Sequence, residues 1–455
     1  MWDRSAARSS NRIASMGEES EYYISDARII DPGTGVDGLG WIRVEDGTIV
    51  CVELGATPVS DGSIVSAAGL IACPGLIDIH VHLREPGGEH KETLETGSLA
   101  AVAGGFTTVC CMPNTNPALD CVEALSSVCR RVAEVDLCRV HVIAAATVGR
   151  AGRALVDIPA LRTAGAVAFS DDGDGIEDDC VCHRVMQGVR EVDSVLFPHC
   201  EFKAISKRGV MHAGPTCDRL GLVGYPPRGE EAMIERDLKL VEETGARYHV
   251  AHVSSAGGIE LIRAAKRAGL PVTTEVCPHH LLLCDEDVIG ADGRPDTNFK
   301  MSPPLRSRDH VQACIAGVLD GTIDCIVTDH APHSAEEKAV DFVDAPMGIV
   351  GLETSLACAA KALIGKDGFD WPDLIRCMST NPAKVLGLGG GALEVGQPAD
   401  ITLIDPTREW TIRADAFRSK SRNTPFDGWG VMGKPVATLV GGRPVFVDDS
   451  FDWAD

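Results

Sequence analysis

Histidine and aspartate side chains in this sequence recur at the ends of short apolar segments, where they could bind a divalent metal. The clearest case is the segment Gly75-Leu-Ile-Asp-Ile-His-Val-His82, in which His80 and His82 stand two positions apart. Because side chains alternate between the two faces of a strand, both imidazoles point to the same side. Neutral imidazole is a common zinc ligand. An isolated pair of this kind is also common as two unrelated histidines on a polar strand edge, so the rest of the chain must decide.

Similar groups follow several later apolar segments. They are Asp171-Asp172, His199, His249 and His252, His279-His280, Asp329-His330 and His333. Imidazole and carboxylate ligands without a thiolate motif suit zinc or another borderline divalent metal. Such an ion polarises a carbonyl and lowers the pKa of bound water to about 7, and a nearby carboxylate can then carry the proton. The pattern predicts metal-assisted hydrolysis or its reverse.

Eight apolar segments that alternate with amphipathic ones must position these groups. The predicted strands are Gly75–His80, Thr107–Asn114, Arg139–Thr147, Ala166–Asp172, Ser194–His199, Arg247–Val253, Val272–His279 and Ile323–His330. The predicted helices between them include Lys91–Ala103, Arg153–Ala164, Glu231–Thr244 and Gly257–Ala268. Eight such units predict an α/β fold, a (β/α)8 TIM-type barrel, whose catalytic groups lie at the carboxyl ends of the strands.

The two flanks of the barrel region read differently. Residues 22–72 and 390–455 contain short β-type runs separated by turn signals, such as Ile42–Val44 and Val445–Val447. They predict one small β-sandwich domain built from both termini, around a barrel domain of residues 73–389. Residues 1–21 read as a disordered or dispensable tail, and either Met1 or Met16 is a candidate start. The acidic end reads as solvated.

The composition excludes several kinds of partner. A formal net charge of −24 argues against nucleic acid and anionic membranes, so an anionic substrate would need a local cationic pocket. The chain has no secretory signal and no apolar run long enough to span a membrane. Its 17 cysteines include no C-x-x-C pair and predict reduced thiols in a cytoplasmic protein. The group Cys180-Val-Cys182-His183 lacks a partner cluster for a zinc site.

Three segments together carry a resemblance to a known family. They are His80–Gly88 continuing to Thr93, Thr107–Pro117 with Met112-Pro-Asn-Thr115, and Thr328-Asp-His-Ala-Pro-His333 followed by Pro346–Thr354. With the other histidines and aspartates, they resemble the amidohydrolase superfamily and, within it, dihydroorotases of the long-chain bacterial class (class I). The resemblance extends from about residue 23 to 447 and is specific because the motifs occur in combination.

The resemblance implies a role for each matching residue. Its metal ligands would be His80 and His82 for a first ion, His199 and His252 for a second, Asp172 as a bridge, and Asp329. Asp329 would also act as the general base toward the attacking water. The substrate-binding residues would be Arg84, Asn114, Ser302, His333, Met347 and Gly348. Arg84, Asn114 and His333 can all donate hydrogen bonds to a carboxylate. The implied cofactor is Zn2+, one or two ions per subunit.

Two positions separate this chain from relatives of the family. Hydantoinases, allantoinases and short-chain dihydroorotases carry a carboxylated lysine where this chain has Asp172, and its fourth strand has no lysine. Asp171 is the alternative bridging residue. The segment Met301-Ser302-Pro-Pro has serine where relatives often have asparagine, so a direct, a water-mediated and an absent contact from Ser302 all stay open.

The activity that the resemblance implies is the reversible cyclisation of N-carbamoyl-L-aspartate to (S)-dihydroorotate, the third step of pyrimidine synthesis. It also implies a homo-oligomer with a possible aspartate transcarbamoylase partner. One rival is another cyclic amidohydrolase, such as a hydantoinase. The other is an inactive dihydroorotase-like subunit that scaffolds the transcarbamoylase, and such a subunit would be expected to lose metal ligands.

Overall fold

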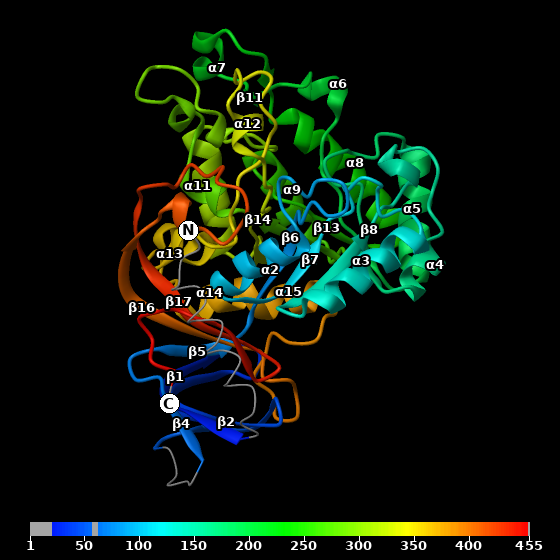
Figure 1. The fold of residues 1–455 in the computed structure, drawn as a ribbon. Coiled ribbons are helices and arrows are strands. Elements are labelled where there is room, and N and C mark those ends of the chain that lie inside the picture. The colour runs from blue at the N-terminus through cyan, green and yellow to red at the C-terminus, as the bar shows by residue number, and fades with distance from the viewer. Residues whose placement is uncertain (1–20, 57–61, 454–455) are drawn as a thin grey trace.

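A barrel of eight parallel strands forms the centre of the computed structural model, which describes residues 21–56 and 62–453 (Figure 1). The strands are β6 (Leu76–Val81), β7 (Phe106–Cys111), β8 (Arg139–Ala144), β9 (Ala166–Phe169), β10 (Val195–Leu196), β13 (Arg247–Val250), β14 (Val272–Val276) and β15 (Cys325–Ile326). They neighbour one another in chain order, and every pair is parallel. The predicted barrel is confirmed, whereas the predictions for the tail and the start of the chain lie outside the described residues.

The first and last strands meet at a seam rather than in a continuous ladder. One bridge joins Val81 to His330, and the His82 N–H donates to the His330 carbonyl at 2.8 Å. The buried Asp78 carboxylate accepts from the His80 N–H and from the Thr328 N–H, each at 3.0 Å. The two oxygens of Asp78 therefore join β6 to the start of the turn after β15.

The strands end earlier than the sequence predicts, and the candidate ligands follow in the turns. The fourth to eighth predicted strands extend three or four residues beyond the observed ends of β9, β10, β13, β14 and β15. His252 has a φ of 29° and Asp329 a φ of 45°, and such values are incompatible with a strand. The backbone leaves the sheet before these residues, which places their side chains at the mouth of the barrel.

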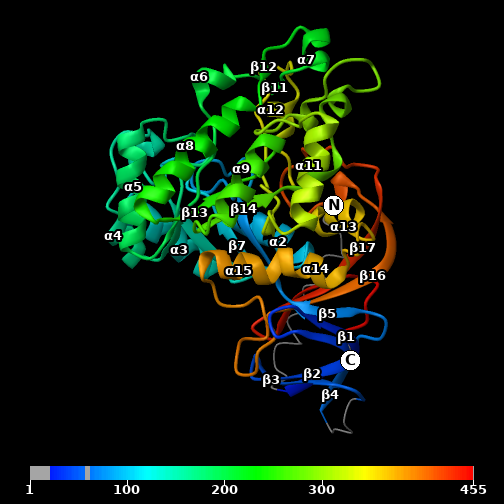
Figure 2. The ribbon, with the colours of Figure 1, turned by 180° about the vertical axis from the view of Figure 1, so that it is seen from behind.

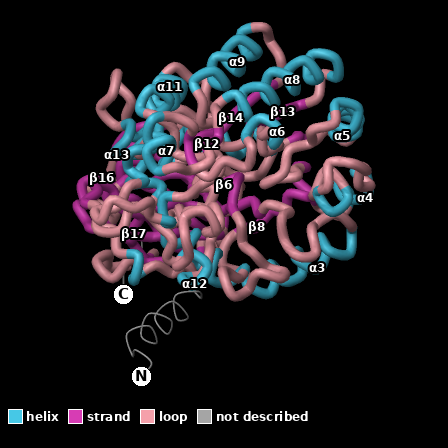
Figure 3. Tube along the Cα trace, turned by 90° about the horizontal axis from the view of Figure 1, so that it is seen from above, coloured by secondary structure: helices cyan, strands magenta, loops and turns pink. Residues whose placement is uncertain are grey.

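Helices surround the barrel, as the view from above shows (Figure 3). They are α2 (Leu94–Ala103), α3 (Val122–Val135), α4 (Ile158–Thr163), α5 (Asp179–Glu191), α6 (Lys203–Ser206), α7 (Pro215–Leu220), α8 (Arg228–Thr244), α9 (Ala256–Arg267), α10 (Pro278–Leu282), α11 (Arg308–Leu319), α12 (Ala335–Lys338), α13 (Ser355–Leu363), α14 (Trp371–Ile375) and α15 (Asn381–Leu386). In α8, Met233, Ile234, Leu238 and Val241 form one buried face, as expected for an amphipathic helix packed on a sheet. Within the described residues, no helix is both long and apolar enough to cross a membrane.

Strands from both termini form a second sheet, whose N-terminal strands lie below the barrel and whose β16 and β17 run up beside it in Figures 1 and 2. Its strands are β1 (Glu21–Asp31), β2 (Val36–Glu45), β3 (Thr48–Leu54), β4 (Ser63–Ser66), β5 (Ile71–Pro74), β16 (Ile401–Thr411), β17 (Gly430–Val440) and β18 (Arg443–Val447). The N-terminal part joins the C-terminal part where β5 pairs antiparallel with β16. The predicted β-module from both termini is present, with its strands hydrogen-bonded into one sheet around buried residues such as Ile24, Ile42 and Leu403.

Candidate active site

Imidazole and carboxylate groups converge at the mouth of the barrel. The His82 Nε2 lies 2.9 Å from the Asp329 Oδ1, and the His80 Nε2 lies 3.6 Å from the same oxygen. The two oxygens of Asp172 lie 3.5 Å from the His80 Nε2 and the His82 Nε2, respectively. The His252 Nε2 is 3.7 Å from the Asp172 Oδ1. All five side chains are buried, so this cluster of polar groups is withdrawn from bulk water.

His199 completes this arrangement from the end of β10. Its Nδ1 lies 3.0 Å from the His252 Nε2 and 3.9 Å from the Asp172 Oδ1, and its Nε2 lies 3.4 Å from the Glu201 carboxylate. Asp172 is therefore within 4 Å of four imidazoles, the position that a bridging carboxylate would need. The six predicted metal ligands thus lie together in one place.

Asp171, the alternative to Asp172, faces the other way. Its Oδ1 accepts from the Ala146 N–H and the Thr147 N–H, each at 2.9 Å, and its Oδ2 accepts from the Thr147 hydroxyl. These bonds use the carboxylate to brace the turn after β8. The geometry therefore favours Asp172 as the ligand and gives Asp171 the bracing role.

The donor atoms at the mouth fit a metal ion. Three buried polar atoms there, the His80 Nε2, the Asp172 Oδ1 and the His252 Nδ1, lack a hydrogen-bond partner. Buried polar atoms without a partner are uncommon and call for an explanation such as an ion. Two groups of converging ligand atoms, His80 with Asp172 and His252 and His80 with His82 and Asp329, meet the spacing for metal coordination. Nitrogen and oxygen donors of this kind suit zinc.

The charges at the site favour cation binding. Burial by itself would raise the pKa of Asp172, but the nearby imidazoles of His80 and His252 hold it well below its usual value. The pKa of Asp329 is likewise lowered, because the effect of His80 and His82 outweighs burial. Both carboxylates therefore stay ionised and available to a cation.

Glu275, within β14, lies against a candidate ligand and was not identified from the sequence. Its Oε1 lies 2.6 Å from the His80 Nδ1 and accepts from the His252 N–H at 3.2 Å. Its Oε2 lies 3.2 Å from the His249 Nε2, while the His249 Nδ1 contacts the Thr273 hydroxyl at 2.7 Å. A carboxylate behind a ligating histidine fixes the tautomer and orientation of the ring. Glu275 therefore orients His80, and His249, whose two ring nitrogens are both bonded, has a structural role.

A cationic side of the mouth adjoins the metal-ligand cluster. The Arg84 guanidinium donates to the Pro332 carbonyl at 3.1 Å and lies 3.4 Å from the His333 Nε2. No carboxylate forms an ion pair with Arg84 within the part of the chain that the structure describes. Burial lowers the pKa of Arg84 to about 10, so the side chain keeps its charge at neutral pH. Burial and the neighbouring cations lower the pKa of His333 to about 3, which leaves its ring neutral.

The other predicted substrate contacts lie around this cationic group. Asn114 bonds to two candidate ligands, His82 Nδ1 at 2.9 Å and Asp172 Oδ2 at 3.3 Å, and so connects the two parts of the site. The Met347 carbonyl lies 3.0 Å from the His333 Nε2. The Gly348 N–H donates to the Lys300 carbonyl, which joins the loop of Met347 to the loop of Ser302. The Ser302 hydroxyl forms no hydrogen bond with any described residue.

The remaining histidines and cysteines have other surroundings. His330 contacts the Glu92 carboxylate at 3.2 Å and the Gly351 N–H, consistent with a structural role. The His280 Nε2 contacts the Pro303 carbonyl at 3.0 Å, next to the Ser302 loop. Cys180, Cys182 and His183 lie on α5 and belong to none of the metal-type clusters among the described residues. All 17 cysteines are free thiols.

Comparison with known proteins shows which family the chain resembles along most of its length. The family model described as dihydro-orotase-like matches residues 69–257. A dihydroorotase from Anaeromyxobacter dehalogenans (strain 2CP-1) is 45% identical over 94% of this chain and 99% of its own length. A dihydroorotase from Geobacillus thermodenitrificans is 47% identical over 89% of this chain and 94% of its own.

A solved structure extends the likeness to the whole fold. The L-hydantoinase from Arthrobacter aurescens superimposes with a TM-score of 0.82 at 27% identity, covering 94% of this chain and 96% of its own. This relative is a hydantoinase, also named a dihydropyrimidinase. With near-complete coverage by curated relatives at about 45% identity, the chain belongs to the dihydroorotase family of the amidohydrolase superfamily.

Proposed function

We propose that the protein catalyses the reversible cyclisation of N-carbamoyl-L-aspartate to (S)-dihydroorotate. The observation that carries this choice of substrate is the position of Arg84, a charged guanidinium without an ion-pair partner among the described residues, beside the metal-ligand cluster. Its free donors suit the carboxylate that dihydroorotate bears on its ring. In a chain with a net charge of −24, such a local cation is the means of holding an anionic substrate.

The side chains at the mouth have distinct parts in the proposed reaction. Arg84 and the neutral His333 hold the substrate carboxylate, and Asn114 positions the ring beside His82 and Asp172. Asp329 removes the proton from the attacking water and transfers it to the departing ring nitrogen. In the biosynthetic direction, Asp329 accepts the proton from the ureido nitrogen and returns it to the leaving water. Its low pKa makes the ionised form the resting state, as a base requires.

Zinc is the proposed cofactor. Its ligands would be His80 and His82 on one side, His199 and His252 on the other, with Asp172 between them and Asp329 facing both His80 and His82. When bound, zinc would polarise the ring amide carbonyl and lower the pKa of water to about 7. We include one or two ions per subunit, a homo-oligomeric state, a cytoplasmic location and an aspartate transcarbamoylase partner in the proposal.

Two alternative functions were considered from the sequence, a hydantoinase and an inactive scaffolding subunit. A hydantoinase activity is disfavoured because the bridging position holds Asp172 and because the mouth carries an unpaired cation. An inactive scaffolding subunit is disfavoured because all six candidate ligands are present and converge.

The decisive experiment measures turnover and metal content on the same preparation. We expect dihydroorotate hydrolysis and carbamoyl-aspartate cyclisation, both abolished by chelation and restored by Zn2+, with one or two zinc ions per chain by elemental analysis. Turnover of hydantoin without dihydroorotate would favour the first rival. Full metal occupancy without turnover of either substrate would reject the proposal. Sedimentation of the enzyme with and without a transcarbamoylase tests the assembly.

A further inference from the structure

An extended segment, Ser419–Asn423, reaches the active site from outside the barrel. It belongs to the connection between β16 and β17 of the terminal sheet. Its side chains alternate: Ser419, Ser421 and Asn423 are buried, whereas Lys420 and Arg422 are exposed. This period of two is that of an extended chain with one face inward. The inward face lies between the loop that follows β6 and the loop that follows β15.

Toward the β6 loop, the segment bonds to residues shortly after Arg84. The Ser419 hydroxyl donates to the Glu92 Oε2 at 2.5 Å, and the Lys420 N–H donates to the Glu92 Oε1 at 3.1 Å. The Ser421 hydroxyl donates to the Lys91 carbonyl at 2.7 Å. Glu92 is itself fully buried. These bonds fix the chain that carries Arg84 to the segment.

Toward the β15 loop, the Ser419 N–H donates to the Glu353 carboxylate at 3.0 Å, and the contacts to residues 331–350 come from Asn423. Its Nδ2 donates to the Ala331 carbonyl at 3.0 Å and to the Gly348 carbonyl at 2.9 Å, and its Oδ1 accepts from the His333 N–H at 3.1 Å. Its own carbonyl accepts from the Val350 N–H at 2.9 Å. Asn423 is 3% exposed, so these bonds do not compete with bulk water. One side chain thus holds both ends of the loop from Ala331 to Gly348.

The packing in this loop leaves little room for adjustment. A Cβ added to Gly348 would lie 2.7 Å from the His333 Cδ2 and 2.5 Å from the Ala331 carbonyl oxygen. The His333 ring also contacts the Met347 carbonyl. A displacement of Gly348 or Ala331 would therefore move the His333 ring as well.

We propose that Asn423 is a positioning residue for the substrate carboxylate. It fixes the His333 loop to a segment whose other end holds the Arg84 loop, and so it sets the spacing between the two groups that grip the carboxylate. This inference rests on the proposed function for the roles of Arg84 and His333. It assigns a task at the active site to a residue of the terminal module, 90 positions beyond His333.

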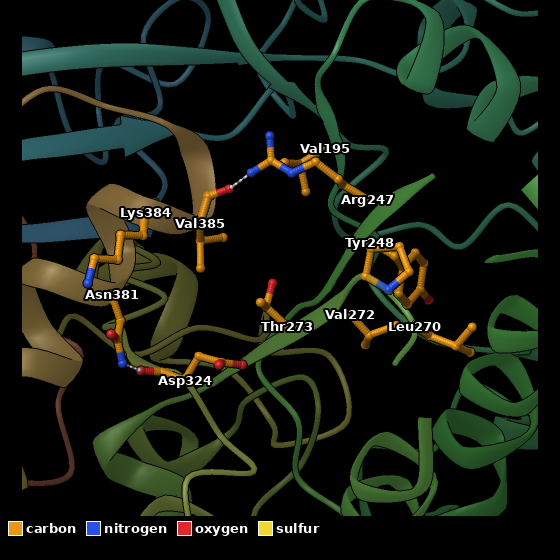
Figure 4. A pocket seen from close by; sticks show the side chains of 11 residues that line it. Val195, Arg247, Tyr248, Leu270, Val272, Thr273, Asp324, Asn381, Lys384 and Val385 are labelled. Carbon is orange, nitrogen blue, oxygen red and sulfur yellow. Dashed lines mark hydrogen bonds between the residues drawn. The ribbon is translucent and has the colours of Figure 1, made fainter. Parts of the chain in front are cut away.

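The test compares two Asn→Asp substitutions. Asn423→Asp keeps the size of the side chain but turns a carboxylate toward two carbonyl oxygens. The matched control is Asn381→Asp, at the opposite end of the barrel, where the Asn381 Nδ2 donates to the Asp324 carbonyl at 2.8 Å (Figure 4). Asn423→Ser serves as a second variant if Asn423→Asp does not fold. Each variant is assayed for KM, kcat, zinc content and hydrogen exchange of residues 331–350.

We expect the Asn423 variants to raise the KM for dihydroorotate at least tenfold, with a smaller change in kcat and unchanged zinc content. Exchange over residues 331–350 should accelerate, whereas Asn381→Asp should leave both readouts unchanged. In a His333→Ala background, the effect of Asn423→Ser on KM should shrink to less than about threefold, because coupled residues are not additive. A purely structural role would instead lower thermal stability with an unchanged KM.

The outcomes separate this inference from the proposed function. An active wild type whose Asn423 variants keep their KM and exchange rates would overturn the positioning role, as would full additivity with His333→Ala. A wild type without dihydroorotate turnover would count against the proposed function, and the exchange measurement would then still decide whether Asn423 holds the loop.

Discussion

The two ends of the barrel both present polar side chains around an opening, yet only one is built for chemistry. The end at which the strands begin is the closed end. It has a hollow of about 340 Å3, lined by Val195, Arg247, Tyr248, Leu270, Pro271, Val272, Thr273, Asp324, Asn381, Lys384 and Val385 (Figure 4). Several of its polar groups bond to the chain itself. Asp324 accepts from the Lys266 ammonium at 2.7 Å, and Arg247 donates to the Val385 carbonyl at 2.5 Å.

At the mouth, several polar groups lack a hydrogen-bond or ion-pair partner among the described residues. There, the His80 Nε2, the Asp172 Oδ1 and the His252 Nδ1 are buried without a partner, and Arg84 has no carboxylate in ion-pair range among the described residues. Leaving such atoms unpaired costs about 1–3 kcal/mol each, so three of them close together call for a bound group. The comparison teaches that a hollow alone does not identify an active site. Buried polar groups that converge without hydrogen-bond partners are the better indicator.

The largest expected difference between the two ends comes from one aspartate at each. Asp329→Ala should lower turnover by about 10²–10⁴-fold, because it removes the proposed base, while the fold and at least one zinc ion remain. Asp324→Ala, next to β15 at the closed end, should leave kcat/KM within about threefold of the wild type. Steady-state kinetics, elemental analysis and circular dichroism check both variants. Near-normal activity of Asp329→Ala would reject the assigned base.

A sharper version of the comparison uses neighbouring residues at the mouth. Asp172→Asn should lose zinc and with it about 10²-fold or more of the activity, because it removes the proposed bridging carboxylate. Asp171→Asn should keep its zinc but lose about 1–3 kcal/mol of stability, since three donors around Thr147 lose a charged acceptor. Zinc content and thermal unfolding distinguish the two. The opposite pattern would make Asp171 the ligand.

A smaller effect is expected from the carboxylate behind the ligands. Glu275→Gln should lower zinc affinity or activity by about 10–100-fold, because His80 loses the group that orients its ring. Asp324→Asn, the same kind of change at the closed end, should leave zinc affinity unaltered. Competition with a chromogenic chelator measures both affinities. Equal losses of zinc affinity from the two substitutions would contradict the view that only the mouth of the barrel binds metal.

The smallest predicted effect is a pH dependence of stability. The pKa of His333 is lowered from 6.5 to about 3 in the folded chain, chiefly by burial. Below pH 6.5 the unfolded chain therefore binds more protons at this site, and its contribution to stability is lost as the pH falls toward 3. Between pH 7.5 and 5.5, the wild type should lose about 1 kcal/mol more stability than His333→Asn. Denaturation at the two pH values tests this, and identical losses would contradict it.

Much of the barrel and of the site followed from local pattern. Apolar segments at regular spacing predicted eight strands, and the residues after them converge as barrel geometry requires. The His80 Nε2, for example, lies within 4 Å of both the Asp172 and the Asp329 carboxylates. Exact strand ends did not follow, because positive φ at His252 and Asp329 depends on the turns that the whole barrel imposes.

Two contributors to the site have no local signal. Glu275 lies inside a strand rather than after its end, and its partner His80 is 195 positions away on a strand that meets it only across the barrel interior. Asn423 belongs to a different sheet altogether and reaches His333 through an extended connection. Periodicity describes which face a residue occupies, but not which distant residue faces it.

The seam between β6 and β15 has a consequence for the folding of the newly made chain. Asp78 and Thr328 meet across 250 positions of sequence, and the histidines of β6 face Asp329 at the same junction. Until β15 and the turn after it have been made, five of the six candidate ligands, all but Asp329, lie on a sheet that cannot close. The candidate ligand set is therefore complete only in a chain whose last barrel strand has docked against the first.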